Sequence, residues 1–252
     1  MSVPLIREYL DKVTAHLETI FEEEQQNILK AARVMADHIK NDEIIHIYGP
    51  GGHSGVAAME IFSRAGGLAC LNAILDGGTM LTNGGDRSMR VERLPGYGKI
   101  VIDTYGVKKG DLIILVNAYG INAALIDSAL EAKRLGATVI GVSSRLHAES
   151  TPPEHPARHP TKQNLHDLVD YHIDTKVPVG DALMTLPGVP QNTGAISSFA
   201  SGFALHALEL ATIELLAKEG FEPPVWRSGN ATGGDEWNKQ FQDRYKGKIA
   251  FI

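Results

Sequence analysis

The sequence predicts an α/β fold built on a parallel, doubly wound sheet. Short apolar runs rich in β-branched residues alternate along the chain with longer segments whose apolar residues recur every three or four positions. The order strand, polar loop, helix, strand occurs twice in succession. Such units pair their strands in parallel and connect them by right-handed crossovers. With 252 residues, 43% of them hydrophobic, the chain can bury a sizeable core.

The first element is a long amphipathic segment that ends near residue 42. Its apolar residues, from Leu5 to Ile39, lie at helical spacing with one gap around Glu24, and Ser2 and Pro4 supply start signals. The spacing predicts one or two helices ahead of the sheet. Such a helix must bury its apolar stripe against the sheet or against a second subunit, and we expect a homodimer or a higher homo-oligomer.

The first strand is predicted at Ile44–Tyr48, followed by a glycine-rich turn and a helix that reaches about Ala65. Gly51 and Gly52 allow positive φ angles and let backbone N–H groups come close to an anion. We interpret Ser54 as the N-cap of the helix, where its hydroxyl adds a donor beside the positive end of the helix dipole. A phosphate would fit there, and the alternative is a tight connection without a ligand.

The remaining elements continue the alternation of strands and helices. A polar turn from Asn117 to Asn122 precedes a helix, and Asn122 is a plausible N-cap. The region from Asp76 to Gly98 has no clear period, and a loop of that length in a compact domain is usually functional, so we expect it to cover the site. Further strands are predicted at residues 68–71, 111–116, 138–142 and 168–173, and further helices at residues 123–135 and at about 195–218.

Composition and charge exclude several classes of function. The formal net charge of −6 argues against a protein that binds nucleic acid or a membrane surface. Cys70 is the only cysteine, which excludes an intrachain disulfide and fits a reducing compartment. The N-terminus carries charges where a signal peptide needs an apolar core, and the apolar region 195–217 contains His206 and Glu209. We therefore expect a cytoplasmic protein in which this region is a core helix.

The carboxyl ends of the predicted strands carry the candidate ligand loops. Open parallel sheets bind ligands beyond these ends, near the point where the strand order reverses. Three of the four loops at this edge contain Ser or Thr near a helix start, a placement that suits a phosphorylated small molecule better than an apolar one. The four loops are residues 49–54, 117–122, 143–145 and 191–198.

These features resemble the SIS (sugar isomerase) domain over most of the chain. The resemblance lies in the first strand, the loop that ends in Ser54, the second loop before AALIDSALEAKRLGATVIGVSS, and the pair Ser197-Ser198 that opens a long helix. It is sharper for one bacterial branch of SIS proteins labelled phosphosugar isomerases. Members of that branch resemble this chain in HSGVAAMEIFSRAGG, ERLPGYG, VPVGDAL and SGNATGGDEWNKQFQDRY.

The resemblance implies a three-layer αβα sandwich with a five-stranded parallel sheet. It implies a single domain with an N-terminal helical segment (1–42), an αβα core (43–220) and a C-terminal tail (221–252), and an oligomer with sites near the subunit interface. The chain departs from the family pattern at Tyr119, where a Ser is usual, and in a first loop that is one residue longer. The residues implied to bind the phosphosugar are Gly51, Gly52, Ser54, Asn117, Tyr119, Asn122, Thr193, Ser197 and Ser198.

Two side chains are candidates for proton transfer. Glu60 lies almost two turns after Ser54 and could move a proton from C2 to C1 of a sugar through an enediol, or could simply face solvent or an interface. His53 could exchange protons with a sugar hydroxyl, or could only bond a loop carbonyl. We expect an aldose–ketose isomerase acting on a phosphorylated sugar or amino-sugar derivative, with no cofactor and no metal. The alternatives are a phosphosugar lyase or etherase, and a non-catalytic phosphosugar sensor.

Overall fold

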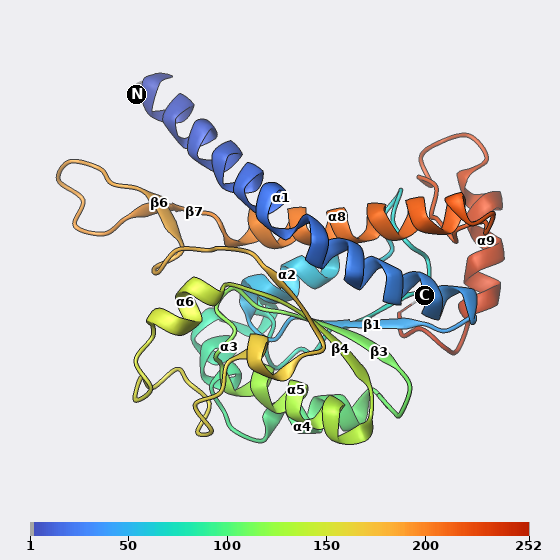
Figure 1. The fold of residues 1–252 in the computed structure, drawn as a ribbon, viewed down its shortest axis with the longest axis horizontal. Helices are drawn as coiled ribbons and strands as arrows, with labels where there is room; N and C mark the ends of the chain where they lie inside the picture. Colours follow the sequence, from blue (N-terminus) through green and yellow to red (C-terminus); the bar gives the residue numbers. More distant parts are fainter. Residues whose placement is uncertain (1–2, 252) are drawn as a thin grey trace.

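The computed structural model describes residues 3–251 as alternating helices and strands (Figure 1). The strands are β1 (Ile45–Tyr48), β2 (Leu71–Ile74), β3 (Leu112–Val116), β4 (Thr138–Ser143), β5 (Tyr171–Asp174), β6 (Ala182–Met184) and β7 (Thr193–Ala195). The helices are α1 (Val3–Lys40), α2 (Gly52–Glu60), α3 (Gly85–Glu92), α4 (Tyr97–Thr104), α5 (Ala123–Leu135), α6 (Arg145–Ser150), α7 (Leu165–Leu168), α8 (Ser197–Lys218) and α9 (Gly234–Tyr245), with a 3₁₀ turn η1 (Leu81–Asn83).

The main sheet has five parallel strands in the order β2-β1-β3-β4-β5. Ile45 of β1 lies opposite both Leu71 of β2 and Leu112 of β3, so the chain leaves β1 to one side and then returns to the other. The strand order therefore reverses between β1 and β3. This confirms the predicted doubly wound sheet, and it places the loops after β1 and β3 next to each other, where such sheets bind ligands.

Neighbouring residues of β1 and β3 face two separate apolar cores. Ile47 packs in the core formed with α1, α2 and α8, whereas Tyr48 packs in the core formed with α4 and α5. The strands β1, β2 and β3 are buried on both faces, as parallel strands covered by helices usually are. Figure 1 shows the two helical layers on opposite sides of the sheet, which confirms the three-layer αβα sandwich.

Helix α8 is apolar on both of its faces. Within residues 3–251 it is the one helix that is long and apolar enough to cross a membrane, judged by length and composition alone. Ala204 and Leu208 on one face are buried in the core that α8 shares with α1, so α8 packs as the predicted core helix. The other face leaves Phe199 50% and Leu210 64% exposed. A helix that is apolar all round is usually covered on both sides.

The N-terminal segment forms one continuous helix. Its first half extends beyond the sheet together with the β6–β7 hairpin, as Figure 1 shows, and the two are joined by a hydrogen bond of 3.0 Å from the Tyr9 hydroxyl to the carbonyl of Ala195. Ile6 and Leu10 on this half of α1 are 66% and 53% exposed. Part of the predicted apolar stripe therefore remains uncovered in a single chain.

The end of α2 and the start of β2 differ from the prediction. Helix α2 ends at Glu60, before the predicted end near Ala65, and β2 begins at Leu71 rather than at residue 68. The intervening segment pairs with the C-terminal tail, because Gly66 donates a hydrogen bond of 2.8 Å to the carbonyl of Trp226 and Ala69 one of 2.7 Å to that of Pro224. This pairing of distant segments leaves no local signal in the sequence.

Several short helices lie where irregular segments were expected. The predicted loop 76–98 contains η1, α3 and the start of α4, the C-terminal tail contains α9, and α7 and β5 replace a strand predicted at 168–173. Helix α3 has Ser88 as its buried residue, so it has no apolar stripe from which helical spacing could be read. The connection between β5 and α8 contains the β6–β7 hairpin.

Candidate functional site

A cavity of about 380 Å³ lies at the carboxyl edge of the sheet, where the strand order reverses. Its volume is in the range of small-molecule sites. The start of α2, helix α3, the loop after β3 and helix α6 all contribute to its walls, so the predicted covering loop does line it. The lining residues discussed below are Gly52, His53, Glu92, Tyr119, Asn122 and His147.

Asn117 joins three of these walls from beneath. Its side-chain amide donates to the carbonyl of Pro50 at 3.0 Å, and lies 3.3 Å from both Ser54 Oγ and Glu92 Oε1. Its Oδ1 accepts the N–H groups of Tyr119 and Gly120, each at 3.0 Å. Asn117 is 2% exposed, so this network is buried. The amide therefore fixes the loop after β1, the loop after β3 and the Glu92 carboxyl relative to one another.

Glu92, at the end of α3, is the functional candidate that the sequence did not reveal. Burial raises the pKa of its carboxyl to about 7, against the opposing effect of the hydrogen bond from Asn117. A carboxyl with such a pKa exists in both protonation states near neutral pH, as acid–base catalysis requires. Glu92 opens the ERLPGYG motif, but its burial comes from residues distant in the sequence.

Gly51 makes room for the Glu92 carboxyl. Its φ of 116° is unfavourable for residues with a side chain, and a Cβ atom there would lie 2.9 Å from Cδ and 3.0 Å from each oxygen of Glu92. The glycine-rich loop thus serves two purposes, a positive φ angle and close contact with an acid. The first was expected from the sequence, and the second was not.

Helix α2 begins at this cavity. The predicted N-cap at Ser54 is wrong, because Gly51 occupies the N-cap position and Ser54 lies within the first turn. The first N–H groups of a helix have no acceptor inside it, so those of Gly52, His53 and Ser54 are available at its positive end. Ser54 is 9% exposed and its hydroxyl lies beside Asn117, whereas His53 is exposed at the cavity wall. This arrangement suits an anionic group.

The opposite wall is aromatic. Tyr119 stacks on His147 of α6 with ring centroids 3.6 Å apart and planes at 18°. Burial raises the pKa of Tyr119 and lowers the pKa of His147, which favours the neutral form of both rings. The stack stands where the family pattern has a small hydroxyl residue, so this wall offers a flat surface to a ligand.

Asn122 occupies the predicted N-cap position of α5, but its side chain makes no capping hydrogen bond. Instead its amide donates to the carbonyl of Ala157 at 3.3 Å. Its buried Oδ1 has no hydrogen-bond partner within residues 3–251. Because an unpaired buried acceptor is costly, this oxygen is a candidate to accept a hydrogen bond from a hydroxyl group of a bound ligand.

Glu60 lies outside this cavity. It lines a groove of about 370 Å³ between α2 and α8, together with Ser198, Phe199 and His206. Its Oε1 is 3.3 Å from His206 Nε2 and 3.2 Å from the Arg64 guanidinium. The two predicted proton-transfer residues are therefore on different surfaces of α2, with His53 at the cavity and Glu60 at the groove.

His206 lies between Glu60 and Glu209, and Glu209 is buried. Its Nδ1 lies 3.5 Å from Oε2 of Glu209, while Oε1 of Glu209 accepts the N–H of Leu68 at 2.9 Å. Burial raises the pKa of Glu209 to about 7. Glu209 is 2% exposed, so it is a second acid with a raised pKa but has less access to a ligand.

Two other predicted phosphate-binding residues have different surroundings. The Ser197 hydroxyl donates to Asp181 Oδ2 at 2.6 Å, and its N–H donates to Asp181 Oδ1 at 2.7 Å, so Asp181 secures the start of α8. Thr193 lies on β7, beside the projecting half of α1. The structure therefore brings together Gly51, Gly52, His53, Ser54, Asn117, Tyr119 and Asn122, and separates them from Glu60, Thr193, Ser197 and Ser198.

Comparison with known proteins adds relatives over the whole chain. The SIS domain model matches residues 8–144. A UPF0309 protein from Oceanobacillus iheyensis is 34% identical over 248 residues, covering 98% of this chain and 99% of the relative. A UPF0309 protein from Streptomyces griseus is 32% identical over 249 residues, covering 98% of this chain and 97% of the relative.

Two solved structures share the fold at low sequence identity. A phosphoheptose isomerase from Francisella tularensis has a TM-score of 0.57 at 16% identity, covering 85% of this chain and 99% of its own. The Vibrio vulnificus NanR protein, complexed with ManNAc-6P, has a TM-score of 0.50 at 14% identity, covering 98% of this chain and 70% of its own. At these identities the likeness concerns the fold alone.

Proposed function

The chain belongs to the SIS domain family, in the group of the UPF0309 proteins, and from this premise we propose that it binds a phosphorylated sugar or amino-sugar derivative and interconverts its aldose and ketose forms. The observation that carries this proposal is the Glu92 carboxyl, which has a pKa of about 7 and faces a cavity beside the start of α2. A helix start suits the phosphate, and a carboxyl of this pKa suits proton transfer.

The phosphate group lies at the start of α2. It accepts hydrogen bonds from the N–H groups of Gly52 and His53 and from the Ser54 hydroxyl, with the helix dipole favouring its charge. Two structural neighbours support this class of ligand, since one is described as a phosphoheptose isomerase and the other as complexed with ManNAc-6P. A phosphate contact from Ser197, Ser198 or Thr193 would require a conformational change or a second subunit that brings these residues to the cavity.

The reaction passes through an enediol. Ionised Glu92 removes the proton from C2 of the aldose, so that the C–H electron pair forms a double bond to C1 and negative charge develops on the carbonyl oxygen. Protonated Glu92 then returns the proton to C1, while a proton moves from the O2 hydroxyl to O1. His53 is placed to exchange the oxygen-bound proton, and Asn122 Oδ1 accepts from a sugar hydroxyl. Each step balances within the substrate and one carboxyl, without a cofactor.

We further propose that the protein acts in the cytoplasm as a homo-oligomer. The exposed apolar side chains of α8, Phe199 and Leu210, lie on the face that carries the groove with Glu60 and His206. Ile6 and Leu10 of α1 add a second exposed apolar surface. A second copy that covered the α8 face would bury both apolar faces of that helix and close the groove.

Two other functions fit the same cavity. A lyase or etherase begins with the same proton removal by Glu92 and then expels a substituent from the neighbouring carbon instead of returning the proton. A non-catalytic sensor would use the phosphate site and the Tyr119–His147 stack for binding only. The stack favours neither isomerase nor lyase, but it supports a ligand that presents a flat group to this wall.

The test combines binding with isotope exchange. A panel of sugar phosphates and N-acylated amino-sugar phosphates is screened by thermal shift, and each ligand found is incubated with the protein in deuterium oxide. An isomerase incorporates deuterium at carbon and forms the isomer, a lyase releases the substituent, and a sensor gives neither. We expect Ser54→Ala to weaken binding about tenfold, through loss of a hydrogen bond to a charged group.

Glu92→Gln and Glu60→Gln form a matched pair for the base. We expect Glu92→Gln to bind the ligand and to lower the exchange rate at least about a hundredfold, the usual contribution of a positioned acid–base group. Glu60→Gln should retain exchange. The opposite result would transfer the chemistry to the groove between α2 and α8, and an unchanged exchange rate in both variants would refute Glu92 as the base.

A further inference from the structure

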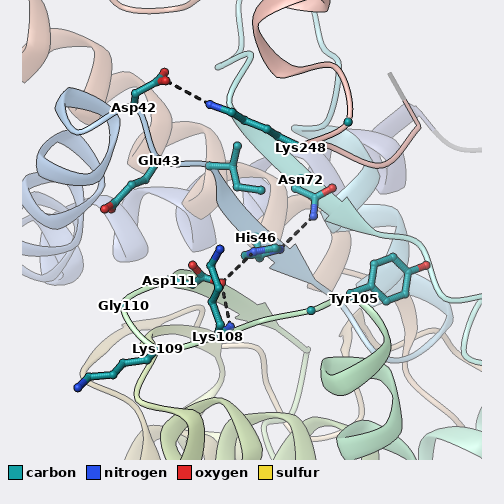
Figure 2. Close-up of a pocket in the computed structure, with 13 residues that line it drawn as sticks. Asp42, Glu43, His46, Asn72, Tyr105, Lys108, Lys109, Gly110, Asp111 and Lys248 are labelled. Carbon is teal, nitrogen blue, oxygen red and sulfur yellow. Dashed lines mark hydrogen bonds and ion pairs between the residues drawn. The ribbon is translucent and has the colours of Figure 1, made fainter.

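A larger cavity than the one at the start of α2 lies at the opposite edge of the sheet and has no part in the proposed reaction. It has a volume of about 560 Å³ and is shown in Figure 2. Its walls come from three distant parts of the chain, namely the turn from Asp42 to Ile44 before β1, the loop from Tyr105 to Asp111 before β3, and Gly247 with Lys248 near the C-terminus. Its volume is that of a small-molecule site rather than of a single inorganic ion.

The floor of this cavity is polar and buried. His46 of β1 and Asn72 of β2 lie opposite each other in the parallel ladder, and each is 4% exposed. The Asn72 amide donates to His46 Nδ1 at 3.0 Å, so Nε2 carries the imidazole proton and faces Asp111 Oδ2 at 3.5 Å. Asn72 Oδ1 accepts the N–H of Ala250 at 2.9 Å. The floor therefore also holds the C-terminal segment in place.

The acidic groups of the cavity already have partners. Asp42 pairs with Lys248 at 3.2 Å and with the Arg244 guanidinium, and Glu43 lies 2.5 Å from His38 Nδ1. Figure 2 shows the Asp42–Lys248 pair at the top of the cavity. The charge of Asp42 is therefore compensated within the chain, whereas the charge of Glu43 is compensated only when His38 is protonated.

Asp111 is stabilised by hydrogen bonds rather than by an ion pair. Its Oδ2 accepts the N–H of Lys108 at 2.9 Å in addition to facing His46. Burial alone would raise the pKa of Asp111, but the hydrogen bonds from His46 and from the Lys108 N–H outweigh it and lower the pKa. An ionised Asp111 is thus satisfied by neighbouring donors.

Two lysines at this cavity, Lys108 and Lys109, form no ion pair within the described residues. Within residues 3–251 neither the Lys108 nor the Lys109 ammonium has a carboxylate oxygen within 4.0 Å. Figure 2 shows the Lys108 side chain running along Asp111 toward the middle of the cavity, whereas the Lys109 side chain points outward. Within the described residues, two lysine ammonium groups at this cavity therefore lack an ion-pair partner, and Lys108 presents its charge to the interior.

We propose that this cavity binds a small polyanion, bearing phosphate or several carboxylate groups, with Lys108 as its main contact. The bound anion also lies beside Lys248, whose neighbour Ala250 is tied to Asn72. Binding therefore holds the turn before β1, the loop before β3 and the C-terminal segment together. The site is separate from the start of α2 and does not depend on the proposed reaction.

Isothermal titration at low ionic strength tests this site with pyrophosphate and citrate, with acetate as a monovalent control. We expect wild-type protein to bind at least one of the polyanions and acetate at least tenfold more weakly. Pyrophosphate alone would indicate a phosphate ester as the ligand, and citrate alone a polycarboxylate. Lys108→Ala should weaken binding about tenfold or more, because a hydrogen bond from a charged donor is lost.

Three matched variants separate this site from general charge effects. Lys109→Ala should weaken binding less than threefold, and Lys30→Ala, an exposed lysine on α1, should leave it unchanged. Ser54→Ala should leave the component of binding that depends on Lys108 unchanged, because Ser54 belongs to the other cavity. The inference is refuted if neither polyanion binds, if acetate binds equally well, if Lys108→Ala has no effect, or if Ser54→Ala abolishes the signal.

Discussion

Replacing Glu92 by Gln should raise the stability of the protein at alkaline pH while removing its activity. The folded protein loses the Glu92 proton at a pKa of about 7, compared with 4.5 for an unperturbed carboxyl. Between these values the folded state binds more protons than the unfolded state, so the free energy of unfolding falls as the pH rises. The gap between the two pKa values lowers the free energy of unfolding by about 3 kcal/mol in total, and by about 2–3 kcal/mol between pH 5 and pH 8.

Urea denaturation of wild type and Glu92→Gln at pH 5 and pH 8 measures this effect. The amide accepts the same hydrogen bond from Asn117 but does not titrate, so the stability of the variant relative to wild type should increase by about 2–3 kcal/mol between the two pH values. Comparing two pH values removes any constant cost of fitting the amide. If Glu92→Gln loses activity and is more stable than wild type at pH 8, the buried carboxyl is kept for function at a cost in stability.

Glu209→Gln provides the control, because burial gives that carboxyl a similar pKa of about 7. It should show the same increase in relative stability between pH 5 and pH 8, but it should retain exchange activity. Equal stability curves for wild type and Glu92→Gln at both pH values would refute the pKa argument. Loss of exchange in Glu209→Gln alone would place the chemistry near the groove.

Two further predictions concern the loop after β1 and the assembly. Gly51→Ala should lower the free energy of unfolding by about 2 kcal/mol or more, since it adds a clash with the Glu92 carboxyl to the strain of a positive φ. Gly66→Ala, with a φ of 85° and open space around its Cβ, should cost only about 1–2 kcal/mol in the same urea titration. Phe199→Glu with Leu210→Glu should convert the oligomer to monomer in sedimentation velocity, and an unchanged sedimentation coefficient would remove α8 from the interface.

The sheet was predictable because its strands are local and strongly patterned. The run from Leu112 to Val116 is buried throughout, and such runs identify parallel strands without knowledge of their partners. The start of β2 was misplaced because Leu68 and Ala69 have the same apolar character as a strand but pair with the C-terminal tail. Only the position of a distant segment distinguishes the two.

The candidate site was predictable where it depends on backbone conformation, and unpredictable where it depends on burial. Gly51 and Ser54 follow from the need for a tight turn and a helix start after β1. The pKa of Glu92 follows from its enclosure by Asn117 and Gly51, residues that lie far away in the sequence. The pairing of Glu60 with His206 likewise depends on how α2 packs on α8.

A crystal structure with a bound phosphosugar from the screen would test the central claim most directly. We predict that the phosphate accepts hydrogen bonds from the N–H groups at the start of α2 and from Ser54, and that C1 and C2 of the sugar lie within hydrogen-bonding reach of the Glu92 carboxyl. A ligand seated in the groove beside Glu60 and His206, or one that turns its C1–C2 edge away from Glu92, would contradict it.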